Sequence, residues 1–377
     1  MQRRGDERAG RPGVAECAQV AGVAPTAVPS FRSMTGPTRM SATLAMDIGG
    51  ANTKAARLHG DSLRTVSRPF EVWRDREALT GVLREVAAEA GEADAVAITM
   101  TAELSDAFRT KREGVGFVLD AAEDALGDRS LSVLTTAGEL VSVEAARARP
   151  WDVAAANWMA TALAVADAHP DALLIDVGST TADIVPITAG RVAASGHDDL
   201  ERLLAGELVY TGVLRTNLAA IALRVPVRGE WCPVASEYFA ISADVHLVLG
   251  HLAQEAYDCP TPDGRPATMP FARERIARLV CADVDQLAGD EIDAIAAFLH
   301  GEQLRQIEHS ARRVERPLPP EAPVVAVGSG AFLGREVAAR LGRAVAGGLA
   351  PWGTNGGELG PAAALAALLA ARLRGPC

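Results

Sequence analysis

Residues 44–58, LAMDIGGANTKAARL, place one acid and two glycines at the end of an apolar run. Gly49 and Gly50 can adopt positive φ and leave their amides uncovered. The residues after them are expected to return as the second strand of a hairpin. In that geometry the amides and Lys54 can face a phosphate while Asp47 reaches a magnesium ion beside it. For one such turn taken alone, a tight hairpin with a surface lysine is the better interpretation.

A second copy of the pattern changes that balance. Residues 172–187, ALLIDVGSTTADIVPI, again run an apolar strand into an acid, a hydrophobic residue and a glycine. Asp176 matches Asp47, and Gly178 with Ser179 matches the two glycines of the first copy. Two such hairpins one domain length apart predict two similar lobes that face a shared cleft.

A third segment, residues 322–336, fits the same cleft. It reads as a buried strand followed by Gly328, Ser329 and Gly330, and then by a helix. The amino end of that helix can bind a phosphate or a ribose, because its backbone amides have no partner within the helix.

The order of DIGGANTK, DVGSTTADI and VGSGA resembles the two phosphate motifs and the nucleoside-side motif of the actin, sugar-kinase and chaperone ATPase superfamily. Within it, the chain resembles the hydantoinase/oxoprolinase-like proteins, and more narrowly a short branch tied to tetrahydromethanopterin-linked one-carbon metabolism. The narrower resemblance rests on residues 99–115 (TMTAELSDAFRTKREGV), 206–216 (GELVYTGVLRT), 236–246 (SEYFAISADVH) and 258–266 (DCPTPDGRP). It extends over roughly residues 43–372 and implies an α/β fold, with two actin/sugar-kinase-like (ribonuclease H-like) lobes and mixed sheets around a central cleft.

The resemblance also implies a reaction of methanofuran biosynthesis. An aminomethyl-furan-methyl diphosphate is joined to the phenol oxygen of a tyramine- or tyrosine-type acceptor, and diphosphate is released. The leaving diphosphate needs Mg²⁺ and cations, and the phenol, with a pKa of about 10, needs a base. For this reaction the candidate magnesium ligands are Asp47, Asp176 and Asp183, acting directly or through water. The candidate diphosphate and substrate contacts are Gly49, Gly50, Lys54, Lys111, Gly178, Ser179, Thr180, Arg215, Gly328, Ser329 and Gly330.

Glu103 and Asp106 are the two candidate bases. Both follow the apolar run at residues 95–100, and loops at such strand ends carry ligands in open α/β sheets. Alternatively, the two acids cap the helix predicted at residues 106–126. For Arg215, binding of a phosphate or carboxylate and pairing with a neighbouring acid are equally good interpretations.

The chain divides into a tail at residues 1–42, predicted to be disordered, a first lobe at 43–170 and a second lobe at 171–377. An insertion at about 225–270 is expected to shape the substrate pocket, and helices are predicted at residues 236–257 and 359–373. A hydrophobic content of 49% with 23% charged residues is typical of a globular enzyme. The net charge of −11 argues against nucleic-acid binding, and no apolar stretch approaches the about 20 residues that span a membrane.

The five cysteines are scattered and predict reduced thiols and a cytoplasmic enzyme. His246 and His251 lie between two cysteines, but no CxxC or HxxxH spacing accompanies them, so both histidines are expected to be structural. The chain is compatible with a homo-oligomer.

Two competing functions remain. One is an ATP-dependent enzyme, either a small-molecule kinase or a hydantoinase-like cyclic amidase. Gly50 weighs against it, because many kinases of the superfamily carry a threonine or serine there. The other is a nucleotide-sensing partner protein, which would not need acids beside the phosphate loops. The identity of the phenolic acceptor stays open.

Overall fold

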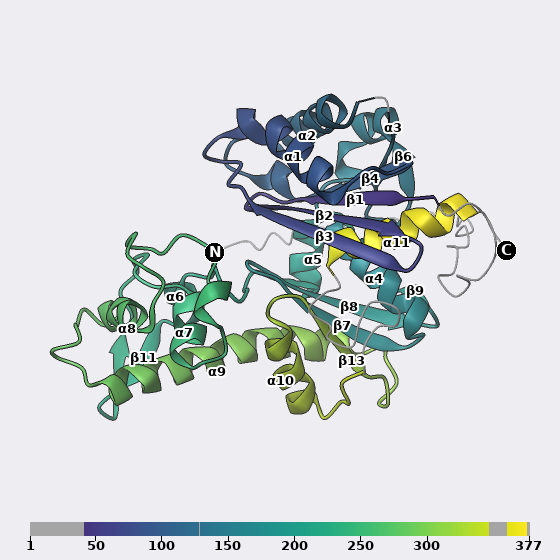
Figure 1. The fold of residues 1–377 in the computed structure, drawn as a ribbon. Coiled ribbons are helices and arrows are strands. Elements are labelled where there is room, and N and C mark those ends of the chain that lie inside the picture. Colours follow the sequence, from purple (N-terminus) through teal and green to yellow (C-terminus); the bar gives the residue numbers. More distant parts are fainter. Residues whose placement is uncertain (1–40, 128, 347–359, 375–377) are drawn as a thin grey trace, which may run out of the picture.

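The computed structural model describes residues 41–127, 129–346 and 360–374, so nearly all of the tail predicted at residues 1–42 lies outside the described part. Two α/β lobes lie one above the other in Figure 1, and a smaller, mainly helical subdomain extends to one side of the second lobe. The structure therefore has the two lobes between which the sequence predicts a cleft.

The first lobe is built on a six-stranded mixed sheet in the order β3-β2-β1-β4-β5-β6. Its strands are β1 (Thr43–Ile48), β2 (Asn52–His59), β3 (Ser62–Pro69), β4 (Ala95–Met100), β5 (Ser130–Leu134) and β6 (Leu140–Ser142). Strand β1 is antiparallel to β2 and parallel to β4, and both β1 and β4 are buried throughout, which explains their mainly apolar sequences. Helices α1 (Leu79–Ala90), α2 (Lys111–Leu126) and α3 (Val143–Ala148) share one buried cluster with this sheet.

The second lobe repeats this arrangement. Its strands β7 (Ala172–Val177), β8 (Ala182–Thr188), β10 (Leu208–Val209) and β13 (Val324–Val327) lie in the order β10-β8-β7-β13, and β9 (Arg191–Val192) pairs with β8. Strand β7 is antiparallel to β8 and parallel to β13, as β1 is to β2 and β4. Helices α5 (Asp199–Ala205) and α10 (Ala331–Leu341) complete the lobe. Both lobes thus have the mixed sheets that the sequence predicts.

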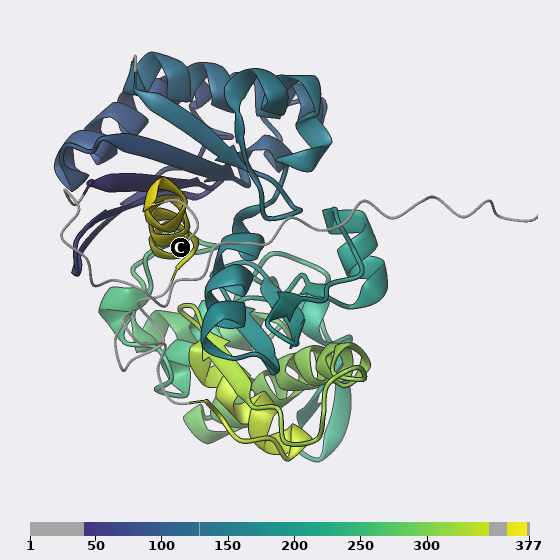
Figure 2. The same ribbon diagram turned by 90° about the vertical axis from the view of Figure 1, so that its right-hand side faces the viewer.

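Two helices, α4 (Asn157–Ala168) and α11 (Pro361–Arg374), lie between the two sheets (Figure 2). They form one buried cluster with residues of both sheets, such as Ala45 of β1 and Leu174 of β7. The last helix also bonds to the first strand, because the Thr43 hydroxyl donates to the Ala366 carbonyl at 2.9 Å. The end of the chain therefore packs against the first sheet. The boundary at residue 170 stays a prediction.

The subdomain contains α6 (Leu218–Ile221), β11 (Arg224–Val227), β12 (Glu230–Pro233), α7 (Ser242–Val248), α8 (Met269–Arg278) and the first part of α9 (Gly289–Val314). A fully buried ion pair fixes α8 against α7, with Arg275 Nη2 at 2.6 Å from Asp244 Oδ1. The second part of α9 continues under the second lobe, where Leu304 and Ile307 pack in its core. Helix α9 therefore joins the subdomain rigidly to the lobe.

The helix predicted at residues 236–257 is wrong. The structure has only α7 (Ser242–Val248) and a short 3₁₀ turn (Gln254–Ala256) in that region. Before α7, Ile241 pairs with Asn217 in a β-bridge, which holds the chain extended. After α7, Gly250 takes a φ of +73°, which ends the helix.

The described cysteines, Cys232, Cys259 and Cys281, are free thiols, while Cys17 and Cys377 lie outside the described residues. Among the described helices, none has both the length and the apolar character needed to cross a bilayer.

Candidate active site

The two predicted hairpins have the same turn geometry. The Gly49 amide donates to the Asn52 carbonyl at 3.0 Å, and the Gly178 amide donates to the Thr181 carbonyl at 2.9 Å. Cross-strand register also matches, since Asp47 faces Lys54 in the first hairpin, where Asp176 faces Asp183 in the second. The equivalent positions of Lys54 and Asp183 thus carry opposite charges.

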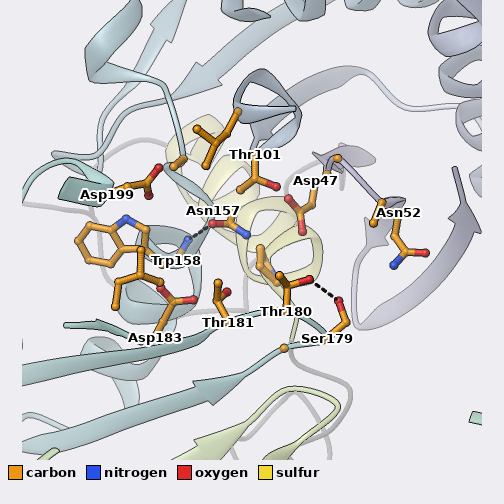
Figure 3. A pocket seen from close by; sticks show the side chains of 18 of the residues that line it. Asp47, Asn52, Thr101, Asn157, Trp158, Ser179, Thr180, Thr181, Asp183 and Asp199 are labelled. Atoms are coloured by element: carbon orange, nitrogen blue, oxygen red, sulfur yellow. Dashed lines mark hydrogen bonds between the residues drawn. The ribbon is translucent and has the colours of Figure 1, made fainter. Parts of the chain in front are cut away.

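A cavity of about 600 Å³ lies between these hairpins. Most of the predicted site residues line it, namely Asp47, Gly49, Gly50, Lys54, Glu103, Asp106, Asp176, Gly178, Ser179, Thr180, Asp183, Arg215, Gly328 and Ser329. Figure 3 shows Asp47 and Asn52 on one side, with Ser179, Thr180, Thr181 and Asp183 facing them. The sequence motifs therefore meet in one place.

Two predicted residues do not line the cavity. The Lys111 ammonium instead pairs with the carboxylate of Asp199 at 2.5 Å, which links α2 of the first lobe to α5 of the second. Gly330 donates its amide to the Val177 carbonyl at 2.8 Å, so it holds the third motif against β7. The insertion at residues 225–270 also contributes no residue to this cavity, so its predicted role in shaping the pocket is not seen there.

Gly328 brings the third motif into direct contact with the second hairpin. Its φ is +84°, and an added Cβ would lie 2.4 Å from Asp176 Oδ1 and from the Val177 carbonyl. A side chain at this position would therefore collide with the carboxylate that we expect to bind metal. Only glycine fits here.

Burial makes the two aspartates of the cleft unusually basic. Desolvation raises the pKa of Asp47 to about 6 and that of Asp176 to about 7, although the Lys54 ammonium lowers both. Repulsion from Asp183 also raises the pKa of both aspartates, and repulsion from Asp47 raises that of Asp176. The buried Oδ1 of Asp47 has no hydrogen-bond partner among the described residues. A divalent cation would supply the missing partner and relieve the repulsion.

Asp183 is differently placed. Its Oδ1 accepts a hydrogen bond at 2.8 Å from Nη1 of Arg202, which is 1% exposed. The Arg202 guanidinium also lies 3.9 Å from the centroid of the Trp158 ring and donates to the Glu207 carbonyl. Asp183 is therefore already paired with a buried cation, which leaves Asp47 and Asp176 as the better candidate metal ligands.

Glu103 is the most deeply buried acid among the residues that line the cavity, with an exposure of 1%. It lies in a short 3₁₀ helix (Ala102–Leu104) directly after β4, and its Oε1 accepts the Ala155 amide at 2.9 Å. Its Oε2 has no partner among the described residues. Desolvation, with a smaller contribution from Asp199, raises the pKa of Glu103 to about 7. Such a carboxylate can accept a proton near neutral pH.

Asp106 lines the same cavity but is exposed. The alternative that either acid caps the next helix is wrong, because the Thr110 side chain caps α2 by accepting the Glu113 amide. Glu103 therefore has the environment of a base, and Asp106 lies at the rim.

Aromatic rings, which sequence analysis did not assign to the site, line much of the remaining wall. Trp73, Trp158 and Tyr210 all border the cavity, although aromatic residues make up only 4% of the chain. Arg215 lies between the two lobes, 5.9 Å from the Trp73 ring and 3.7 Å from Glu71. Arg215 therefore pairs with an acid and also borders the cavity, and its binding of a phosphate or carboxylate stays a prediction.

One signal in the sequence marks the cleft independently of the motifs. The chain has 37 basic residues, and only Lys54 and Lys111 are lysines. One lysine lines the cavity and the other bridges the two lobes beside it. Further lining residues, Asn52, Thr101, Asn157, Thr181 and Asp199, carry no such signal because they come from separate loops and helix starts.

Close packing of α2 fixes the position of Glu103 and leads to a stability prediction. A Cβ added at Gly114 would lie 2.6 Å from both the Cα and the carbonyl oxygen of Glu103. We expect Gly114→Ala to lower the free energy of unfolding by about 1–3 kcal/mol through overpacking, and to slow turnover by displacing Glu103. Chemical denaturation and steady-state kinetics measure the two effects.

Gly116, one half-turn further along α2, provides the matched control. No atom of the described residues lies within 4 Å of a Cβ added there, so Gly116→Ala should stabilise the protein by about 0.5–1 kcal/mol through helix propensity. If Gly114→Ala stabilised the protein equally, the packing of α2 against Glu103 would not be the constraint described above.

Comparison with known proteins identifies the family of this chain. The family model described as hydantoinase/oxoprolinase matches residues 94–371. This chain belongs to the hydantoinase/oxoprolinase family. It is also 37% identical over 274 residues to the (4-{4-[2-(gamma-L-glutamylamino)ethyl]phenoxymethyl}furan-2-yl)methanamine synthase of Methanocaldococcus jannaschii, which covers 72% of this chain and 82% of the relative. The synthase of the same name from Methanococcus vannielii is 44% identical over 124 residues, covering 33% of this chain and 55% of the relative.

Among solved structures, the nucleotide-free acetone carboxylase aligns with a TM-score of 0.54 and 11% identity, covering 89% of this chain and 70% of that chain. At this identity the likeness shows a shared fold. The predicted two-lobed α/β fold of this hydantoinase/oxoprolinase family member is confirmed, and so is the narrower resemblance to the methanofuran-biosynthesis synthases.

Proposed function

We propose that this protein is an aryl-ether-forming transferase of methanofuran biosynthesis. The name of the M. jannaschii relative describes a product in which a phenoxy oxygen is bonded to a methyl carbon on a furan ring. The observation that carries the proposal is the unpaired, buried Oε2 of Glu103 in the same cavity as both glycine hairpins. That arrangement supplies a base beside an anion site.

In the proposed reaction, the phenol oxygen of a γ-glutamyltyramine-type acceptor attacks the methylene carbon of an aminomethyl-furan-methyl diphosphate. The new carbon–oxygen bond replaces the bond to the diphosphate, which leaves with its electron pair. Glu103 takes the phenolic proton, and Trp73, Trp158 and Tyr210 surround the flat rings and exclude water. All atoms and charges balance without oxidation or reduction.

The diphosphate binds between the hairpins in this proposal. The amides of Gly50 and Ser179 and the Lys54 ammonium would face it, as in other backbone anion sites. The amides of Gly49 and Gly178 donate within their own turns and so shape the two loops instead. Asp47 and Asp176 would hold Mg²⁺. The three aspartates do not place ligand atoms within 4.8 Å of one another in the described chain, so water would complete the ion's shell. When bound, Mg²⁺ would stabilise the charge of the leaving diphosphate.

The test is turnover without nucleotide. Purified protein with Mg²⁺, the furan-methyl diphosphate and γ-glutamyltyramine should release diphosphate and form the ether in equal amounts, as followed by mass spectrometry and a diphosphate assay. Nucleotide should neither be needed nor consumed, because the substrate itself carries the leaving group. If the protein is inert until ATP is added, or hydrolyses ATP in step with product, the kinase or cyclic-amidase alternative replaces this proposal.

A further inference from the structure

Three histidines gather outside the cleft. His246 lies in α7, His251 follows it, and His300 comes from α9. Ligand nitrogens of all three rings lie within 4.8 Å of one another, and the centroids of His251 and His300 are 4.6 Å apart. None of the three borders the cavity between the hairpins. Packing of α7 against α9 therefore creates a cluster that the spacing of the histidines in the sequence does not predict.

The tautomer of His246 follows from its neighbour Gln303. The Gln303 amide nitrogen donates to the Gly212 carbonyl at 2.8 Å and to the Thr211 hydroxyl at 3.0 Å. Because a carbonyl only accepts, the orientation of this amide is fixed, and Gln303 Oε1 faces His246 Nε2 at 3.0 Å. His246 Nε2 must then carry the proton and donate it. Its Nδ1 is left with a lone pair.

That lone pair is buried and unsatisfied. His246 has an exposure of 0%, and its Nδ1 has no hydrogen-bond partner among the described residues. Desolvation lowers the pKa of His246 to about 3, so the ring is neutral at physiological pH. A buried polar atom without a partner costs free energy. A bound cation would remove that cost.

His300 shows the same pattern with a different partner. Its Nε2 lies 3.1 Å from Glu336 Oε2, which can only accept when ionised, so Nε2 carries the proton. The Nδ1 of His300 is also buried and has no partner among the described residues. A carboxylate that orients a histidine in this way is the usual outer-shell arrangement of zinc ligands.

We propose that His246, His251 and His300 form a zinc site, in which Nδ1 of His246 and Nδ1 of His300 are two of the ligands. Imidazole nitrogens suit Zn²⁺, whereas Mg²⁺ and Ca²⁺ prefer oxygen ligands. Gln303 and Glu336 orient the two buried rings, and Phe332 shields them, with its centroid 5.1 Å from that of His246. His251 is exposed, so the fourth position of the zinc ion opens to solvent.

The experiment uses the full chain without a histidine tag, treated with a chelator and dialysed. Titration with Zn²⁺ in a calorimeter should show one equivalent bound, and Co²⁺ should bind with visible d–d absorption from nitrogen coordination. Zinc should also raise Tm, because a ligand that binds only the folded state stabilises it. Absence of stoichiometric zinc binding to the wild-type protein overturns the proposal.

Variants locate the ion. His251→Ala removes an exposed ligand, so the fold should survive, and zinc affinity should fall by at least about tenfold. His309→Ala is the matched control, since His309 is exposed on the same α9 helix but lies outside the cluster. It should bind zinc like the wild type. Equal affinities of the two variants would overturn the assignment, as would an unchanged Co²⁺ spectrum in His251→Ala.

Discussion

Glu103→Gln should lower kcat of the proposed ether-forming reaction by about 100-fold to 10,000-fold, the usual contribution of a general base. Glutamine keeps the shape of the side chain, and its amide oxygen can still accept the Ala155 amide. It cannot accept the phenolic proton. Substrate binding should therefore persist while turnover is lost, which steady-state kinetics and equilibrium binding measure separately.

The pH profile of the wild-type enzyme gives a second readout of the same residue. Burial raises the pKa of Glu103 to about 7, and only the ionised carboxylate accepts a proton. The value of kcat/KM should therefore rise with pH below about 7 and level off above it. The profile is recorded at saturating Mg²⁺, because free Asp47 and Asp176, with pKa values of about 6 and 7, would titrate in the same range. Under that condition the rising limb should disappear in Glu103→Gln. Persistence of the limb in the variant would mean that another group titrates.

Asp106→Asn separates the two acids that the sequence leaves as alternatives. Because Asp106 is exposed at the rim, this variant should keep most of its turnover and the pH profile of the wild type. Loss of turnover in Asp106→Asn with an active Glu103→Gln would transfer the role of base to Asp106.

Lys54→Ala should lower kcat/KM for the diphosphate substrate on the order of 100-fold, the scale for one preorganised charge-stabilising group. Lys54 lines the cavity, and its ammonium lowers the pKa of both Asp47 and Asp176. Its removal takes away a contact to the diphosphate. It also removes the positive charge that offsets the negative charges of the two carboxylates. The side chain is exposed, so the free energy of unfolding should barely change.

Lys54→Arg is the control for charge. Arginine keeps the positive charge but presents it as a planar fork, so part of the lost activity should return. Diphosphate affinity that is the same in Lys54→Ala and the wild type would return Lys54 to the role of a surface residue in a tight hairpin.

The sequence by itself determined the local motifs of this protein. Strands β1 and β4 match the predicted runs because both are buried throughout and their sequences are mainly apolar. The sequence also located both glycine turns, although none of Gly49, Gly50 and Gly178 takes positive φ. Glycine is needed there for space only at Gly49, where an added Cβ would lie 2.6 Å from the Asn52 carbonyl oxygen. Repetition of the Asp-x-Gly pattern predicted two facing lobes, and Asp47 and Asp176 do line one cavity.

Contacts between distant segments were decided only by the tertiary structure. The pKa of Glu103 lies near 7 because its side chain is buried, and this burial depends on α2 and on the backbone at Ala155. The sequence around residue 103 predicts neither contact. The histidine cluster likewise depends on α9, which brings His300 to His246. A residue's neighbours along the chain fix its local conformation, whereas its desolvation and its partners come from segments that packing brings together. Motifs could therefore locate the cleft, and only the fold could show that Glu103 is more deeply buried than Asp106 and has an unpaired oxygen.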